Sequence, residues 1–367
     1  MKLNYFLPTH IHFDTDCLQK NSAVFSSYGN KAAIITGRHS AKSCGALDDV
    51  TTILDAHHIA YEVYNQVENN PSVETVREIA EKAKAFGAAF IIGIGGGSPL
   101  DASKAVAVLC ANETLDALDL FLNNFDTKLP LIAIPTTAGT GSEATQYSVL
   151  LRKDLETKVS FGNQHTYPTV ALIDPKYTYY LKLSTTITTA VDAFTHVLEG
   201  YLGKRSNPLS DSMALVGFQC FGSCLPHLLT DQLTCEDREQ LMMLSLLGGL
   251  VISQAGVTSP HGMGYCYTYF KDIPHGQANG FLLREYLKLN YPQVPEKIDT
   301  VMHLMGMKNI DEFSAQLEQL IGKPPVLTTD EIEKFTELSM LQKGSLGNSP
   351  TDMTIDVVKD LWIRQNQ

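Results

Sequence analysis

The sequence has 367 residues and a mass of 40.3 kDa, enough for two domains of ordinary size. Its 44% hydrophobic and 19% charged residues are typical of a globular protein. The formal net charge of −12 leaves no basic face to neutralise phosphates, which argues against nucleic acid and anionic membranes as partners.

The sequence shows no pattern that predicts export or a membrane-spanning helix. The N-terminus shows no apolar run followed by a small-residue cleavage site, so no signal peptide is predicted. The longest apolar stretch, Leu241–Val251, is too short to cross a bilayer and predicts a buried helix. Seven cysteines without CxxC spacing fit reduced thiols, and a cytoplasmic location is expected.

Short apolar runs and helical patterns alternate through the first half of the chain. Patterns typical of strands occur at Lys31–Thr36, Ala60–Tyr64, Ala88–Ile94, Leu129–Ile134 and Val170–Ile173. Helical patterns occur at Ala41–Ala56, at Ser72–Phe86 with Ser72 as cap, and at Pro99–Cys110. This alternation predicts a parallel sheet covered on both faces, with ligands bound beyond the carboxyl ends of the strands.

The first chemically distinctive loop, Gly95–Asp101, directly follows an apolar strand and directly precedes a helix. Glycines let the backbone approach a phosphate, and a helix N-terminus supplies free N–H groups and the positive end of a dipole. A simple tight turn uses the same residues. The loop by itself therefore leaves anion binding and a structural turn both open.

A second loop, Pro135–Glu143, also follows a predicted strand. It contains four hydroxyl side chains and two glycines. These groups are suited to surround a ribose and a nicotinamide amide, although an ordinary polar loop has the same composition. Its place at a strand end is what favours binding.

After Tyr180 the sequence predicts helices and no strand. Helical patterns cover residues 184–203, 208–228, 235–255, 261–268 and 275–290, and several shorter ones follow. In the first of these, Asp192 and His196 stand four positions apart and project from the same face. An aspartate and a histidine placed in this way can bind one metal ion.

Two more histidines extend this candidate metal site. His261 follows Ser259-Pro260, and His275 follows Asp272-Ile273-Pro274. Proline is favoured at the first helical position and Ser or Asp before it can cap, so both histidines are predicted at helix starts. Three imidazoles and one carboxylate suit Fe(II), Zn(II), Co(II) or Mn(II). A single histidine on a helix is usually ordinary, and eleven histidines make chance clusters easy.

These motifs occur in one order along nearly the whole chain. They are Gly95-Gly-Gly-Ser-Pro-Leu-Asp101-Ala-Ser-Lys104, Pro135-Thr-Thr-Ala-Gly-Thr-Gly-Ser-Glu143, Asp192-Ala-Phe-Thr-His196 with Glu199, and His261 with His275-Gly276. In this combination the chain resembles the iron-containing (group III) alcohol dehydrogenases, close to the members that act on propanediol, lactaldehyde or butanol.

The resemblance implies a two-domain fold with dehydroquinate synthase-like architecture. Residues 1–180 would form an α/β dinucleotide-binding domain, and residues 181–367 an all-α domain for metal and substrate. The implied metal ligands, which are also the catalytic residues, are Asp192, His196, His261 and His275. The implied cofactor-binding residues are Gly37, Asn70, Gly96, Gly97, Ser98, Asp101, Thr136, Thr137, Thr140, Ser142 and Lys158.

Two positions depart from the family pattern. Tyr265 stands where the family often has a histidine proposed to relay protons, which puts the proton route in doubt. Ala190 replaces the usual glycine before the first ligand, and we expect this to be tolerated. The role of Glu199 also stays open, because it can support a metal ligand or simply face solvent.

The predicted activity is reversible hydride transfer between a nicotinamide cofactor and a short primary alcohol, diol or aldehyde, with Fe(II) or Zn(II) as the metal. Alternatives are a glycerol dehydrogenase-like or dehydroquinate synthase-like reaction on the same scaffold, and a binding protein without catalysis. The lyases need a basic pocket, for which few Lys or Arg residues lie near the ligands. Intact ligands and loops argue against a protein without catalysis.

The cofactor preference is predicted from the end of the first apolar strand. Strict NAD specificity commonly uses a carboxylate there, which binds the ribose 2′-OH and repels a 2′-phosphate. This chain has Gly37, followed by Arg38, Ser40 and Lys42. NADP(H) is therefore predicted as the preferred cofactor, with NAD(H) possible.

A homodimer or larger assembly is also expected. The extended stretch Asn4–Phe13 has no hairpin partner next to it in the sequence. An unpaired strand invites pairing with another chain.

Overall fold

The computed structural model describes residues 5–366, which divide into two compact units. The first unit, here the α/β unit, comprises residues 6–137 and 141–181. The second, here the helical unit, comprises Tyr5, residues 138–140 and residues 182–366. The chain thus passes from one unit into the other after Leu181, apart from the short segment 138–140.

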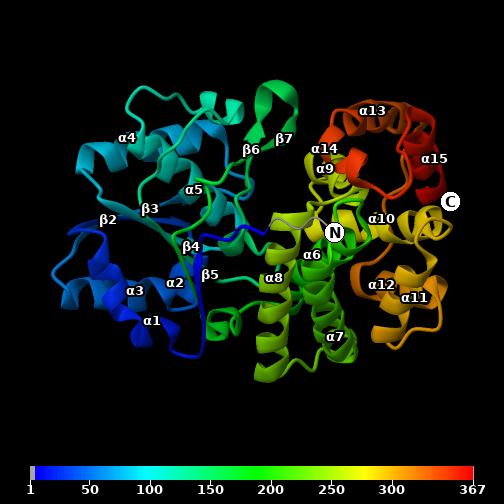
Figure 1. Cartoon of the computed structure of the whole chain (residues 1–367), viewed down its shortest axis with the longest axis horizontal. Helices are drawn as coiled ribbons and strands as arrows, with labels where there is room; N and C mark the ends of the chain where they lie inside the picture. Colours follow the sequence, from blue (N-terminus) through cyan, green and yellow to red (C-terminus); the bar gives the residue numbers. More distant parts are fainter. Residues whose placement is uncertain (1–4, 367) are drawn as a thin grey trace. The chain divides into compact units, whose positions relative to one another are not determined.

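A six-stranded sheet forms the centre of the α/β unit, in the order β1-β8-β5-β4-β2-β3 (Figure 1). The strands are β1 (His10–Phe13), β2 (Lys31–Gly37), β3 (Ala60–Val67), β4 (Phe90–Gly95), β5 (Leu131–Pro135) and β8 (Val170–Ile173). Every neighbouring pair is parallel. The parallel sheet expected from the apolar runs is therefore confirmed, and the carboxyl ends of β2, β4 and β5 lie next to one another.

Helices cover both faces of this sheet (Figure 1). They are α1 (Cys17–Lys20), α2 (Ser40–Ser43), α3 (Ala46–Ala56), α4 (Val73–Phe86) and α5 (Gly97–Ala111), and short 3-10 turns occur at Ser22–Ser27, Asp119–Leu122, Ser142–Ala144, Lys153–Leu155 and Pro175–Thr178. Because successive strand residues face opposite sides, Ile35 packs with α4 and α5 while Ile34 packs with α1 and α3. The expected cap is present, since Ser72 Oγ accepts a hydrogen bond from Thr75 N.

The α/β unit adds to or departs from the sequence expectations in three places. The helix predicted at Ala41–Ala56 is broken between α2 and α3 at Gly45, whose φ of 83° is left-handed. An antiparallel hairpin, β6 (Ser148–Arg152) with β7 (Thr157–Phe161), was not predicted. The stretch Asn4–Phe13 has no hairpin partner within its described residues, as expected, but it is not an unpaired strand, because β1 pairs with β8 far along the chain; Asn4 lies outside the described residues.

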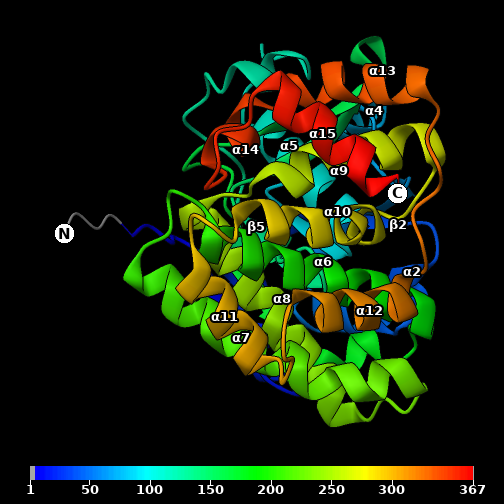
Figure 2. The same ribbon diagram turned by 90° about the vertical axis from the view of Figure 1, so that its right-hand side faces the viewer.

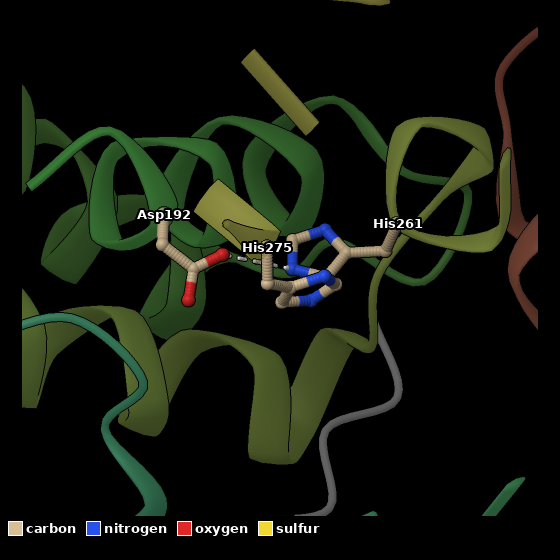
Figure 3. Close-up of side chains that lie close together, drawn as sticks. All are labelled: Asp192, His261 and His275. Atoms are coloured by element: carbon tan, nitrogen blue, oxygen red, sulfur yellow. Dashed lines mark ion pairs between the residues drawn. The ribbon is translucent and has the colours of Figure 1, made fainter. Parts of the chain in front are cut away.

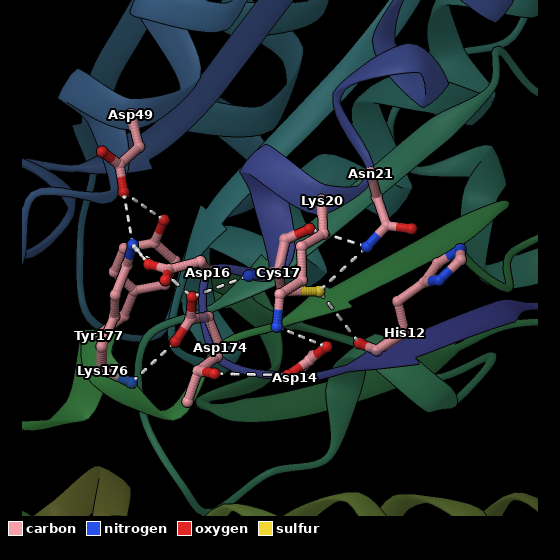
Figure 4. Close-up of polar contacts among 11 residues, drawn as sticks. His12, Asp14, Asp16, Cys17, Lys20, Asn21, Asp49, Asp174, Lys176 and Tyr177 are labelled. Atoms are coloured by element: carbon pink, nitrogen blue, oxygen red, sulfur yellow. Dashed lines mark hydrogen bonds and ion pairs between the residues drawn. The ribbon is translucent and has the colours of Figure 1, made fainter.

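A partly buried polar cluster connects the segments that follow β1 and β8 at the sheet edge (Figure 4). The carboxylate of Asp174, just after β8, accepts hydrogen bonds from Cys17 N at 3.0 Å and Lys176 N at 3.1 Å. Lys176 Nζ lies 3.1 Å from Asp49 on α3, and the Tyr177 hydroxyl donates to the same carboxylate at 2.7 Å. The segments that follow β1 and β8 are thus bound to each other and to α3.

The helical unit consists of ten helices among the described residues (Figure 2). They are α6 (Leu183–Leu202), α7 (Pro208–Thr230), α8 (Cys235–Ala255), α9 (Ser259–Lys271), α10 (His275–Asn290), α11 (Pro295–Leu304), α12 (Ile310–Ile321), α13 (Thr329–Met340), α14 (Lys343–Asn348) and α15 (Ile355–Gln365). No strand occurs in residues 182–366, which confirms the all-helical prediction. Helix α6 packs against α7, α8 and α10.

One helix, α7, is long and apolar enough to cross a membrane by length and composition alone, among the described residues. It packs against α6 and α8 within the helical unit. A second candidate would require α8 and α9 to act as one span across a bend of 115°. The apolar stretch Leu241–Val251 lies inside α8, where most of its side chains are buried.

Candidate metal centre and cofactor loops

Helix α6 carries the first two predicted ligands on its buried face. Asp192 and His196 are 4% and 5% exposed, one helical turn apart. Helix α8 passes close to them, because Gly248 has no side chain: a Cβ there would lie 3.2 Å from His196 Cβ. Burial lowers the pKa of His196 to about 4. Its imidazole is therefore neutral near pH 7, which is the form that binds metals.

The other two histidines lie at helix starts, as predicted, but the caps differ from those expected. His261 is in the first turn of α9, whose N-cap is Thr258 and not Ser259. His275 is the first residue of α10, with Pro274 as N-cap. Asp272 ends α9 in the left-handed conformation, φ 53°, and does not cap α10. Asp272, which the sequence suggested as the cap of α10, thus belongs to the sharp turn between α9 and α10.

Three of the four predicted ligands converge on one point (Figure 3). One ligand atom each from Asp192, His261 and His275 lies within 4.8 Å of the others, and Asp192 Oδ1 is 3.7 Å from His261 Nε2. His196 is not in this set of atoms. Its ring stacks on His261 with 4.6 Å between centroids, so it borders the same point. An oxygen and several nitrogens in this arrangement fit a divalent transition metal.

Glu199, whose role the sequence left open, supports His261 from behind. Its carboxylate is fully buried, and Oε1 lies 2.7 Å from His261 Nδ1. The Thr258 hydroxyl donates to Oε2 at 3.0 Å, and the Tyr286 hydroxyl lies 2.9 Å from Thr258 Oγ1. With the shared proton on Nδ1, His261 presents the Nε2 lone pair toward Asp192, the arrangement common behind metal-bound histidines.

Close contact between α10 and α6 depends on Gly276. A Cβ at this position would lie 1.9 Å from Thr188 O and 2.7 Å from Asp192 Cβ. Without a side chain, α10 can run directly against α6 and bring His275 to Asp192. The sequence shows that Gly276 follows His275, but it does not show that this glycine packs against α6.

The glycine-rich loop lies at the end of β4, where Gly96 is the N-cap of α5. Gly95 has φ 153°, and a Cβ on it would lie 2.5 Å from Pro99 Cγ. A Cβ on Gly96 would lie 2.9 Å from Thr137 Oγ1, so the two loops run side by side within the α/β unit. Gly97 is the first residue of α5, whose 15-residue length gives its N-terminus a full helix dipole.

Three predicted cofactor positions from distant segments contact one another. Asn70, after β3, adopts φ 57° and donates its backbone N–H to Ser98 Oγ at 3.1 Å. Lys158 Nζ on β7 lies 3.4 Å from Asn70 Oδ1. The hairpin β6–β7, missed from the sequence, is therefore what carries Lys158 to the glycine-rich loop.

Asp101 and Ser142 bind each other, although both were predicted to contact the cofactor. Ser142 Oγ donates to Asp101 Oδ1 at 2.6 Å, and Val149 N donates to Oδ2 at 3.0 Å. Lys104, fully buried, donates to Ser142 Oγ at 2.7 Å and to Tyr147 O at 2.6 Å. Burial lowers the pKa of Lys104 to about 8. This network fixes the second loop against α5, a role for Lys104 that sequence reasoning missed.

The remaining predicted positions fall at strand ends or in the loop tip. Gly37 ends β2, while Thr136 and Thr137 follow β5, with Thr136 N donating to Gly95 O at 2.9 Å. Thr140 belongs to the segment 138–140 of the helical unit. There a Cβ on Gly139 would lie 2.7 Å from Thr189 Cβ. The structure thus gathers most of these residues at the carboxyl edge of the sheet.

A parallel sheet with a glycine-rich strand–helix turn and a helical unit with a carboxylate and histidine cluster are the two parts that a metal-dependent dehydrogenase requires. Family comparison agrees: residues 8–175 match the model of iron-containing alcohol dehydrogenase, and residues 186–361 match that of the Fe-containing alcohol dehydrogenase family, C-terminal. The chain belongs to the iron-containing alcohol dehydrogenase family, and it is an oxidoreductase with the dehydroquinate synthase-like fold.

Individual relatives support this assignment along the full chain. Alcohol dehydrogenase 4 of Schizosaccharomyces pombe is 29% identical, over 98% of this chain and 88% of its own length. Lactaldehyde reductase of Escherichia coli K12 is 28% identical, over 90% of this chain and 91% of its own. The solved iron-containing alcohol dehydrogenase of Thermotoga maritima is 34% identical with a TM-score of 0.92, covering 99% of each chain. The resemblance seen in the sequence is confirmed.

Proposed function

We propose that this chain transfers a hydride between NADP(H) and a short primary alcohol, diol or aldehyde at a divalent metal. Within this proposal the α/β unit binds the dinucleotide and the helical unit holds the metal and the substrate. The observation that carries it is the convergence of Asp192, His261 and His275, with Glu199 bound behind His261. His196, stacked on His261, is the fourth proposed ligand.

The residues fit such an ion in donor type, burial and protonation. Asp192 supplies a buried carboxylate, and His261 is held with its Nε2 toward that carboxylate. When bound, a divalent ion would act as a Lewis acid on the substrate oxygen and lower the pKa of the alcohol. Nitrogen and oxygen donors accept Fe(II) or Zn(II), and the affinity order favours Zn(II) when both are present.

The α/β unit offers the groups that a dinucleotide requires. The N–H groups at the start of α5, together with Gly96, Gly97 and Ser98, are proposed to bind the pyrophosphate. The ribose and nicotinamide are proposed to contact Thr136, Thr137, Thr140 and Ser142. Asn70 and Lys158 are proposed to make polar contacts with the cofactor beside Ser98. Asp101 is proposed to support Ser142. Gly37, with no carboxylate, is proposed to permit the 2′-phosphate of NADP(H).

The experiment that tests this function combines metal removal with a cofactor assay. Metal-free protein and the His261→Ala variant should not oxidise NADPH with a short aldehyde such as propanal, whereas wild-type protein reloaded with Fe(II) or Zn(II) should. NADPH binding, followed by its fluorescence, should persist in both inactive samples, because the loops at the start of α5 are unchanged. Undiminished activity after complete chelation would contradict the metal assignment.

Two further features belong to the proposal. We expect a homodimer, because β1 lies at the sheet edge and, in the part of the chain that the structure describes, no strand pairs with its outer side. We also expect the protein to work in a reducing compartment such as the cytoplasm, since all seven cysteines are free thiols.

A further inference from the structure

Asn279 lies on α10, one helical turn after His275, and its side chain is completely buried. Its Nδ2 donates a hydrogen bond to Asp192 Oδ1 at 3.2 Å and lies 3.3 Å from His275 Nε2. The exchanged orientation of this carboxamide is unfavourable, because it would put Oδ1 against a carboxylate oxygen. A neutral donor therefore touches two of the proposed metal ligands without being a ligand itself.

The carboxamide fits in this position because the neighbouring helix has a glycine where it approaches. A Cβ at Gly264 on α9 would lie 2.1 Å from Asn279 Oδ1, so the oxygen occupies the space that any other residue there would fill. Gly276, which brings α10 against Asp192, closes the distance on the other side. Asn279 is thus enclosed between α9 and α6 with its amide directed at Asp192.

For the Asp192 carboxylate this contact matters, because among the described residues Asn279 is its only hydrogen-bond donor. A buried carboxylate with no donor is costly and turns toward any available partner. The Asn279 N–H groups instead fix the carboxylate where it faces His261 and His275.

We infer that Asn279 is a positioning residue of the metal centre, which orients Asp192 and so raises metal affinity. The inference rests on the metal centre proposed above. Loss of such an outer hydrogen bond typically lowers metal affinity or activity by roughly 10–100-fold.

A matched control is available on the same helix. Asn290 is also completely buried, donates to Tyr286 O at 2.8 Å and accepts from Thr351 N at 2.9 Å, and touches no proposed ligand. Replacing it removes a buried asparagine of α10 without altering the metal centre.

The test compares Asn279→Leu, which keeps the branched shape of the side chain but loses the donor, with Asn290→Leu in the full chain. Dissociation constants for Zn(II) and Co(II) are measured by chelator competition, the Co(II) sites by visible absorption, and NADPH binding by fluorescence. Asn279→Leu should weaken metal binding roughly tenfold or more and change the Co(II) spectrum, with unchanged NADPH affinity. Asn290→Leu should lower the melting temperature but leave the metal constants as in wild type.

Each result bears on one of the two proposals. Wild-type metal affinity and spectrum in Asn279→Leu would overturn the role of Asn279 while leaving the metal centre standing. Failure of the wild-type protein itself to bind Zn(II) or Co(II) would overturn both. If Asn279→Leu does not fold, Asn279→Ala replaces it, since that variant leaves a cavity and no clash, and the same loss is expected.

Discussion

At the scale of single residues, Gly37 offers a direct test of cofactor choice. A Cβ added there would meet Val67 O at 3.6 Å and Ser40 Oγ at 3.7 Å, which are ordinary contact distances, so Gly37→Asp should fold without strain. Its carboxylate would repel a 2′-phosphate and accept a hydrogen bond from a 2′-OH. Arg38 and Lys42 are exposed nearby, and the structure gives neither a carboxylate partner among the described residues.

We predict that Gly37→Asp lowers kcat/KM for NADPH about tenfold or more, equivalent to about 1.4 kcal/mol, and changes that for NADH much less. Steady-state kinetics with both cofactors measure this, with Gly37→Ala as the uncharged control. If the wild-type enzyme already has a tenfold higher kcat/KM for NADH, the interpretation of this strand end is wrong.

Glu143 gives a pH-dependent prediction for stability. It is fully buried, and burial raises its pKa to about 7, from 4.5 in the unfolded chain. Between these values the unfolded state releases a proton that the folded state keeps. Stability from this group is therefore present below pH 4.5 and lost as the pH rises through the folded pKa of about 7, by roughly 3 kcal/mol in total.

The Glu143→Gln variant should lack this loss. Denaturant unfolding measures the free energy of unfolding of both proteins at pH 5 and pH 8. The difference, variant minus wild type, should increase by about 2 kcal/mol at the higher pH, because only the wild type loses stability. An unchanged difference between the two pH values would mean that Glu143 is ionised in the folded protein, paired with Lys104.

The residues that the sequence could and could not identify differ in a physical way. Asp192 and His196 are readable because four positions on a helix share one face, and His261 and His275 because proline marks helix starts. Glu199 and Asn279 act through groups on other helices, so their roles depend on packing that no local pattern records.

At the scale of elements, Gly276 determines how closely α10 can approach α6. A methyl group there would lie 1.9 Å from the backbone oxygen of Thr188. Gly276→Ala must therefore push the two helices apart and separate His275 from Asp192. Overpacking of this kind costs about 1–3 kcal/mol or more.

We predict a lower melting temperature and weaker Zn(II) binding for Gly276→Ala, measured by calorimetry and chelator competition. Gly344→Ala is the control, since a Cβ on Gly344 would meet nothing within 4 Å. Equal behaviour of the two variants would show that the helices can separate without cost to the centre.

Elements with a strong period were predictable, and those defined by contacts were not. The apolar strands β4, β5 and β8 and the helices α8 and α10 follow from local pattern, because burial on both faces or on one stripe leaves a clear signature. In the hairpin β6–β7 the polar Ser148 and Lys158 are buried while Val149 is only partly buried, so the hydropathy of the sequence does not follow the burial of the strands. The break between α2 and α3 depends on the single residue Gly45.

At the scale of the whole molecule, the pairing of β1 with β8 determines which backbone groups at this edge of the sheet are left to pair with a second chain. His10 N donates to Thr169 O and Asp14 N donates to Ile173 O, so the backbone N–H groups of the even-numbered residues point toward β8. By the period of two, Ile11 and Phe13 direct their N–H groups to the outer edge. A second copy of the chain can add its own β1 along this edge.

Ile11→Pro is therefore predicted to turn a dimer into a monomer. Proline removes only the outward N–H of residue 11, while the bonds from His10 and Asp14 to β8 remain. Light scattering at micromolar concentration should give a wild-type mass of about twice 40.3 kDa and a variant mass near 40.3 kDa. Ile11→Ala, which shortens the side chain but keeps the outward N–H, is the control and should stay dimeric. A wild-type mass equal to that of one chain would refute the dimer, and a dimeric Ile11→Pro variant would place its interface elsewhere.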